Sequence, residues 1–164
     1  MTMKTIKKIL APNKSNNSSG FTIVEILVII LIIGVLITVL VLTYSGIQTK
    51  QRNSIRINNI KLIQANLETF YVQSGFYPTL DELNNLTWTK NNLKNVDPSV
   101  LQDPSSKPNT PRFNVSPKLY VYSYQPTASN GTSSCDDKTI ACGKYTLIAT
   151  LEGNTGIFSQ KSLN

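Results

Sequence analysis

Few side chains in this sequence could carry out catalysis or hold a metal ion. The 164 residues include no histidine and only two cysteines, Cys135 and Cys142. Ser-His-Asp and Cys-His catalysis, zinc sites that need two histidines, and haem ligation by imidazole are therefore excluded. The sequence also contains neither a phosphate-binding loop nor a dinucleotide-binding glycine pattern. We therefore expect a protein that is not an enzyme and has no cofactor.

The spacing of the two cysteines indicates a structural loop. Six residues separate Cys135 from Cys142, whereas a redox pair would favour the C-x-x-C spacing. In an exported domain the default state of such a pair is a disulfide. Closing so short a loop stabilises the fold by about 2–3 kcal/mol in the chain-entropy model.

A long apolar block lies near the N-terminus. From residue 26 to residue 42, only one glycine and one threonine interrupt a run of Ile, Leu and Val. The block from Phe21 to Tyr44 would form a helix of about 36 Å, against about 30 Å for the hydrocarbon core of a bilayer. A cleaved secretory signal has a shorter apolar core, and the residues after Tyr44 match its cleavage site poorly. We therefore expect a retained membrane helix.

The basic residues gather on the two flanks of this block. The net charge of +7 divides into +4 for residues 1–20, −1 for Glu25, +3 for residues 45–75 and +1 for residues 76–164. Because the C-terminal part is nearly neutral, the excess favours a membrane-flanking role over nucleic-acid binding. Each flank carries four basic residues, so charge alone does not set the orientation. They are Lys4, Lys7, Lys8 and Lys14 on one side and Lys50, Arg52, Arg56 and Lys61 on the other.

The helical pattern continues beyond the apolar block. Apolar residues between 57 and 71 recur at three- and four-residue spacing, which is typical of an amphipathic helix. No proline interrupts residues 21–74, and Gly75 is a natural end. This predicts one helix about 80 Å long. Its first half, residues 21–44, would serve the membrane and assembly, and its second half, residues 45–75, would pack against the rest of the chain.

Residues 76–164 are predicted to form a β-rich head. Thr79 and Glu82 have capping-box spacing, which predicts a short helix over about 80–86. Residues 87–118 are rich in Asn, Pro, Lys and Ser and indicate a loop with one helical turn. Strands are expected at 119–124, 144–151 and 156–160. The predicted fold is α+β, with a long N-terminal transmembrane helix whose amphipathic half packs under a small antiparallel sheet.

The start of the apolar block resembles a known signal. Residues 20–36 read G-F-T-I-V-E-I-L-V-I-I-L-I-I-G-V-L and follow a basic leader. This string resembles the class III signal of type IV pilins and type II secretion pseudopilins, in which glycine, phenylalanine and a glutamate precede an apolar helix. The resemblance implies that a prepilin peptidase removes residues 1–20 by cutting between Gly20 and Phe21, and then N-methylates Phe21. The sequence departs from the family in its long leader and in having Leu42 where many pilins have a helix-kinking proline.

The resemblance also implies a role for Glu25. An acid in a membrane segment costs about 2.5–3.5 kcal/mol at the centre, less near an end, and usually has a partner. In a filament, Glu25 would neutralise the new amine of Phe21 on a neighbouring copy, because pairing removes a penalty that each charge bears alone. The alternative is a Glu25 that lies at the cytosolic interface and reaches water.

The implied function is structural. The chain would cross the cytoplasmic membrane once, with its N-terminus inside. A platform protein and an ATPase would then extract it from the bilayer. Copies of the chain, with other pilins, would form a surface filament for adhesion, motility or DNA uptake. Two alternatives stay open: a pseudopilin of a type II secretion or competence piston, and a monomeric membrane-anchored binding protein, which would have no use for Glu25.

Two further features could indicate ligands. Some major pseudopilins bind calcium through a C-terminal loop, and Asp136 and Asp137 lie inside the cystine loop. Two adjacent acids without a third placed ligand do not make a calcium site, so we expect a solvated loop. Tyr120, Tyr122 and Tyr124 alternate and would share one face of a strand. Stacking on single-stranded DNA is conceivable, but no basic cluster flanks these tyrosines, so core or filament contact is favoured.

Overall fold

The computed structural model describes residues 20–135, 139–153 and 155–164, and the side chains of these residues except 41–43. The chain divides into two compact units, Met1–Leu42 and Thr43–Asn164. Each unit is considered by itself. The leader before Gly20 and the two candidate calcium ligands, Asp136 and Asp137, lie outside the described residues.

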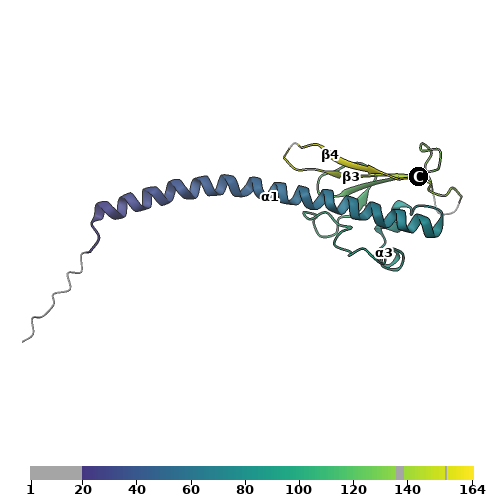
Figure 1. Cartoon of the computed structure of the whole chain (residues 1–164), viewed down its shortest axis with the longest axis horizontal. Coiled ribbons are helices and arrows are strands. Elements are labelled where there is room, and N and C mark those ends of the chain that lie inside the picture. Colours follow the sequence, from purple (N-terminus) through teal and green to yellow (C-terminus); the bar gives the residue numbers. More distant parts are fainter. Residues whose placement is uncertain (1–19, 136–138, 154) are drawn as a thin grey trace, which may run out of the picture. The chain divides into compact units, whose positions relative to one another are not determined.

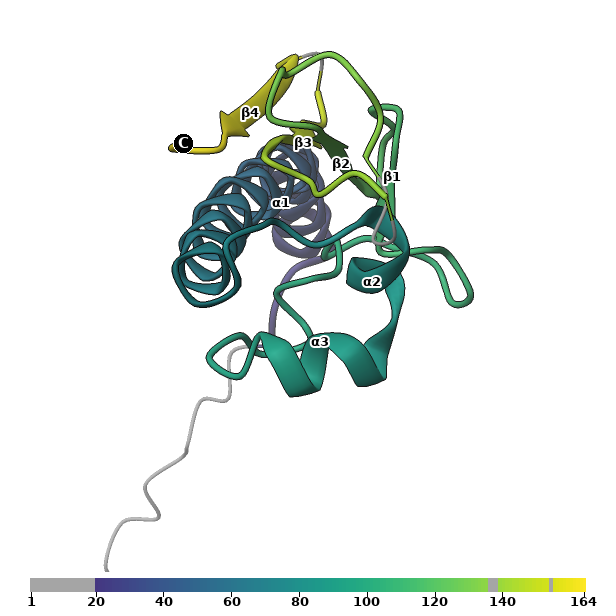
Figure 2. The same cartoon turned by 90° about the vertical axis from the view of Figure 1, so that its right-hand side faces the viewer.

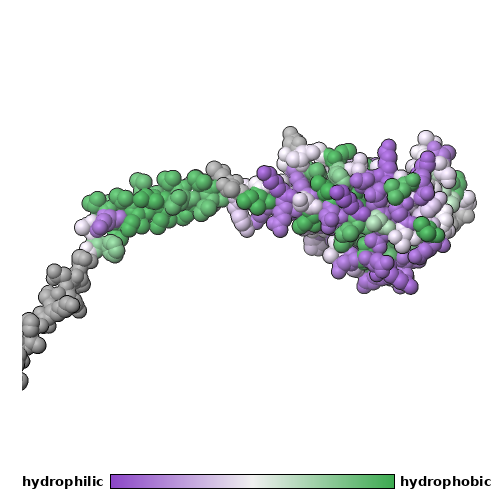
Figure 3. Space-filling view, in the orientation of Figure 1, coloured by the Kyte–Doolittle hydropathy of each residue, from purple (hydrophilic) through white to green (hydrophobic). Residues whose placement is uncertain are grey.

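Helix α1 (Ile23–Ser74) is a single helix of 52 residues, which confirms the predicted long helix (Figure 1). It ends at Gly75, whose φ of 80° favours glycine. In the first unit, every side chain from Ile23 to Leu40 is exposed, and Figure 3 shows this part of the helix as an almost continuous apolar surface. The helix is long and apolar enough to cross a membrane.

The second unit contains a four-stranded mixed sheet in the order β1-β2-β3-β4. The strands are β1 (Phe113–Asn114), β2 (Tyr122–Thr127), β3 (Lys144–Thr150) and β4 (Ile157–Lys161). The pairs β2–β3 and β3–β4 are antiparallel, as predicted, whereas β1 adds a short parallel pair to β2. The sheet is therefore mixed rather than purely antiparallel, because β1 forms where the sequence predicted a loop.

Strand β2 begins three residues later than predicted. Leu119 and Tyr120 form a turn between the bridged residues Lys118 and Val121, and Tyr120 has a φ of 67°. Tyr120 therefore does not share a strand face with Tyr122 and Tyr124. Those two tyrosines are fully buried in the apolar core, so core packing is their role.

Two short helices follow α1, one inside the range predicted as a helix and one at the start of the predicted loop, where one helical turn was expected. They are α2 (Leu80–Asn84) and α3 (Leu86–Asn92). The predicted capping box of Thr79 and Glu82 is present at the start of α2. Asn85 has a non-helical ψ of 113°, and its side chain accepts hydrogen bonds from the amides of Thr87 and Trp88, so it starts a second helix. Asparagine favours such N-cap positions, which explains the break.

The core of the second unit lies between α1 and the elements of the head. Ile60, Ile63 and Leu67 of α1 are fully buried, each contributing about 1.5–3 kcal/mol of apolar transfer free energy. Figure 2, which looks along α1, shows the strands on one side of the helix and α2 and α3 on another. The amphipathic half of α1 therefore packs against the head, as predicted.

Polar contacts also hold the end of α1 to the head. Glu68 accepts hydrogen bonds from the hydroxyls of Tyr77 and Tyr145, each at 2.7 Å. A disulfide joins Cys135 to Cys142, and the Cys142 carbonyl accepts a hydrogen bond from the Tyr77 amide at 2.8 Å. The loop between β2 and β3 is therefore tied to the chain that leaves α1.

Candidate functional site

The N-terminal end of α1 is closed by a capping box. The Glu25 carboxylate accepts hydrogen bonds through Oε2 from the Thr22 amide at 2.8 Å and the Thr22 hydroxyl at 3.0 Å. The Glu25 amide in turn donates to the Thr22 hydroxyl at 3.2 Å. Because α1 begins at Ile23, Thr22 is its N-cap and Glu25 its third residue. Each side chain thus satisfies an amide that the first helical turn leaves without a partner.

This arrangement places the carboxylate beside the expected new terminus. Phe21 directly precedes the capping residue Thr22 and is exposed, as is Glu25. Both hydrogen bonds to the carboxylate are accepted by Oε2. Among the described residues, Oε1 of Glu25 therefore keeps its capacity to bind a cation. The T-x-x-E spacing of Thr22 and Glu25 is readable in the sequence and matches that of Thr79 and Glu82, but this cap was not among the sequence-based predictions.

Gly20 lies in an open part of the structure. It is exposed, and a Cβ added there would meet no atom within 4 Å. Its φ also lies outside the left-handed region. The fold of the described chain therefore does not require glycine at this position, so any such requirement would come from another protein that reads the site.

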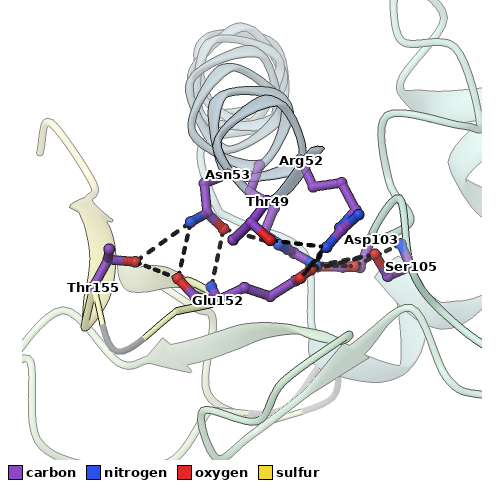
Figure 4. A network of polar contacts seen from close by, with 8 residues as sticks. Thr49, Arg52, Asn53, Asp103, Ser105, Glu152 and Thr155 are labelled. Atoms are coloured by element: carbon purple, nitrogen blue, oxygen red, sulfur yellow. Dashed lines mark hydrogen bonds and ion pairs between the residues drawn. The ribbon is translucent and has the colours of Figure 1, made fainter. Parts of the chain in front are cut away.

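A second candidate site is a cluster of ion pairs that joins α1 to two loops of the head (Figure 4). We name it the arginine–carboxylate cluster, and it consists of Arg52, Arg56, Asp103 and Glu152. Arg56 is fully buried. Its Nε donates to Asp103 Oδ2 at 2.6 Å and its Nη2 to Asp103 Oδ1 at 3.0 Å, a two-pronged pairing. Its Nη2 also lies 2.6 Å from Oε1 of Glu152.

Glu152 is held by side-chain and backbone contacts together. Arg52 Nε donates to both of its carboxylate oxygens, at 3.0 and 3.2 Å. The Asn53 side chain accepts from the Glu152 amide at 2.9 Å and donates to the Glu152 carbonyl at 3.0 Å. The hydrogen bond from Arg52, with further contributions from Arg56, lowers the pKa of Glu152 to about 2. The stabilisation from this lowered pKa is therefore complete above the ordinary carboxylate range and is lost as the pH falls towards 2.

The cluster predicts a large stability effect for one substitution. Replacing Arg56 with leucine would leave the buried carboxylate of Asp103 without its ion pair, while the partly exposed Glu152 would keep its pair with Arg52. Removing one member of a buried ion pair costs about 3–5 kcal/mol. We expect the free energy of unfolding of the detergent-solubilised Arg56→Leu chain, followed in denaturant by circular dichroism, to fall by this amount.

Lys61→Leu is the matched control for that measurement. Lys61 lies on the same helix and is exposed, and surface substitutions of this kind change stability by about 0.5 kcal/mol or less. Equal stability of the two variants would show that the cluster does not stabilise the head.

The cluster corrects the sequence-based interpretation of two basic residues. Arg52 and Arg56 were assigned to the basic flank of the membrane segment, but both are committed to ion pairs inside the second unit. Lys50 and Lys61 of that flank remain exposed. No local pattern could have identified the pairs, because Arg56 and Asp103 are 47 residues apart and Arg52 and Glu152 are 100 apart.

The described residues contain no group of three or more His, Cys, Asp or Glu side chains that could hold a metal ion. The structure therefore offers no metal centre within its described ranges. It leaves two arrangements for function: the exposed N-terminal turn of α1, and a head fixed to the second half of the same helix.

Comparison with known proteins finds a match for the first of these arrangements, the N-terminal turn of α1. Residues 15–41 match the family model described as the prokaryotic N-terminal methylation motif. This motif is the class III signal of type IV pilins and pseudopilins. The matched range includes Gly20, Phe21, Thr22 and Glu25. No curated protein and no solved structure matches the chain.

Proposed function

We propose that this chain is a prepilin, a structural subunit that is cut after Gly20 and polymerises through α1 into a type IV pilus-like filament. The observation that carries the proposal is the methylation motif at residues 15–41, which coincides with a helix whose apolar side chains are uncovered from Ile23 to Leu40. Such a surface must be covered by lipid or by protein. A pilin-type subunit uses both in turn.

The proposed sequence of events uses the features of the N-terminal turn. A prepilin peptidase cuts between Gly20 and Phe21 and N-methylates Phe21. The apolar half of α1 holds the subunit in the cytoplasmic membrane, with its N-terminus inside, until a platform protein and an ATPase extract it. In the filament at the cell surface, Glu25 pairs with the Phe21 amine of a neighbouring copy. The geometry of Glu25 supports this last step, because the helix cap engages Oε2 and no hydrogen bond from the described residues reaches Oε1.

Two other functions remain as alternatives. A pseudopilin of a type II secretion or competence piston would use the same cut and the same pair, but it would not build long surface fibres. A monomeric membrane-anchored binding protein would need neither. The capping box gives Glu25 a role even in a monomer, so the presence of Glu25 alone does not separate these functions.

The proposal is tested on the mature chain. Intact-mass spectrometry of protein purified from membranes is expected to find an N-terminus at Phe21 that carries one added methyl group. Electron microscopy of sheared surface material then separates a pilus from a piston subunit. An intact Met1, or an N-terminus within the head, would contradict the proposed processing.

A further inference from the structure

A polar hollow lies between the C-terminal part of α1 and the end of α3, two elements of the second unit. Its volume is about 430 Å³, within the range of about 300–1,000 Å³ that small-ligand sites occupy. Five of the residues that line it carry primary amides, and we therefore name it the amide hollow. They are Asn66, Gln73, Asn91, Asn92 and Asn95.

The chain itself uses little of the hydrogen-bonding capacity of these amides. No hydrogen bond from the described residues reaches the side chains of Gln73, Asn91 and Asn95, and all three are exposed. Asn66 and Asn92 each donate one N–H to a backbone carbonyl one turn earlier in the same helix, at 2.9 Å. Each of them keeps its carbonyl oxygen and a second N–H. The amide hollow therefore presents five groups that can both donate and accept.

The amide hollow also has an apolar part, which Phe70 and Leu93 supply. Leu93 is buried. The half-buried ring of Phe70 is held by edge contacts with Phe76 and Trp88, with ring centres 5.8 and 5.3 Å apart. A ligand in the hollow could therefore combine apolar contact with several hydrogen bonds, as small-ligand sites commonly do.

The lining disfavours several other classes of ligand. Among the described residues that line the amide hollow, none carries a carboxylate and Lys94 alone is charged. Calcium and magnesium sites are built around carboxylates, and nucleic acid needs a basic patch. Peptides bind to strand edges, to largely apolar grooves or to arginine clusters, and the lining offers none of these. An uncharged ligand rich in hydroxyl and amide groups fits the lining best.

The placement of the amides on two walls favours an acetamido group. In a trans amide the N–H and the carbonyl point in opposite directions, so an acetamido group needs an acceptor on one side and a donor on the other. Asn66 and Gln73 belong to α1, whereas Asn91 and Asn92 belong to α3. A side-chain amide can fill either role, so the two walls together can hold such a group from both sides.

We propose that the amide hollow binds an N-acetylated oligosaccharide, with an acetamido group held between α1 and α3 and a sugar ring against Phe70. This inference goes beyond the proposed function, because it requires neither the cut after Gly20 nor assembly into a filament.

The test measures binding of a defined sugar by saturation-transfer NMR. The full-length chain is held in micelles of lauryldimethylamine oxide, a detergent without a sugar headgroup. The probe is N,N′,N″-triacetylchitotriose, and cellotriose is its matched control, with hydroxyls in place of the acetamido groups. We expect saturation to pass from the protein to the acetyl methyl protons. We also expect cellotriose to bind about fivefold more weakly or less tightly still, because it lacks hydrogen bonds that the acetamido groups make.

Two substitutions remove one amide from each wall. Gln73→Ala and Asn91→Ala lose no hydrogen bond to a described residue, so their circular dichroism should match the wild type. Each is expected to raise the Kd of triacetylchitotriose about fivefold, and the double variant more than about tenfold. Gln51→Ala is the matched control, because Gln51 is an exposed amide on the same helix outside the hollow. Its Kd is expected to equal that of the wild type.

Four outcomes would overturn the inference. Absence of saturation transfer to triacetylchitotriose would leave the hollow as ordinary solvated surface. Equal binding of cellotriose would show that acetamido groups are not recognised. An unchanged Kd in the double variant would place the sugar elsewhere on the chain. Displacement of the sugar by triglycine would assign the hollow to a peptide backbone instead. None of these results bears on the cut after Gly20, which intact mass tests separately.

Discussion

Replacing Gly20 with valine is expected to leave the precursor uncut in the membrane, with mature protein nearly absent. The structure removes the competing explanation that valine would disturb the fold. Gly20 is exposed, a Cβ there meets nothing within 4 Å, and its φ is not one that favours glycine. The loss of processing would therefore report a pocket of the peptidase that rejects bulk through steric clash.

Gly46→Val is the matched control for this substitution. Gly46 lies on α1, where an added Cβ also meets nothing within 4 Å, and we expect this variant to be processed as the wild type is. The two variants are compared by immunoblot of membrane fractions and by intact mass. Wild-type amounts of mature Gly20→Val chain would contradict the proposed cut after Gly20.

The elements that could be predicted from the sequence are those whose signals are local. The length of α1 follows from an apolar block, an amphipathic stretch and Gly75, and all three lie within one continuous segment. The predicted ends of β3 and β4 lie within one residue of the observed ends. Alternating apolar residues mark these strands in the sequence, and turn residues lie on either side of them. The cap of α2 was found because Thr79 and Glu82 are three residues apart.

The features that could not be predicted depend on contacts between distant segments. Strand β1 has only two residues and exists because it pairs with β2. The arginine–carboxylate cluster joins residues 47 and 100 positions apart, and a charge pattern along the sequence cannot show which basic residues are buried. The late start of β2 at Tyr122 depends on the left-handed turn at Tyr120, a conformation that sequence preference argues against.

The N-terminal turn of α1 could be predicted from the sequence only in part. The resemblance assigned Glu25 to a contact between subunits, and the structure adds a contact within its own chain, with Thr22. These two roles can be separated because they need different chemistry. Capping needs a hydrogen-bond acceptor at position 25, which glutamine also supplies. Neutralising an amine needs a charge, which only the carboxylate supplies.

Glu25→Gln is therefore expected to abolish filaments or make them rare, while maturation and the amount of membrane protein stay near wild type. With the carboxylate gone, the amine of each incoming Phe21 would enter the apolar bundle unpaired, at a cost of about 3–5 kcal/mol per subunit. A difference of about 1.4 kcal/mol is a tenfold change in an equilibrium constant, so the penalty repeated at every addition stops growth. Glu25→Leu, which loses the charge and the cap together, should lack filaments for the same reason.

Thr22→Val tests the other role, because it removes the hydroxyl that caps the helix and keeps the negative charge of Glu25. Loss of an N-cap costs about 1 kcal/mol, which a helix of 52 residues can tolerate, so we expect filaments of this variant to persist. All three variants are measured by mature protein in membranes and by the yield of sheared surface filament. Wild-type filament yield from Glu25→Gln would show that the charge of Glu25 is not needed for assembly. Loss of filaments in Thr22→Val, with Glu25→Gln unaffected, would instead make the first turn of the helix the feature on which assembly depends.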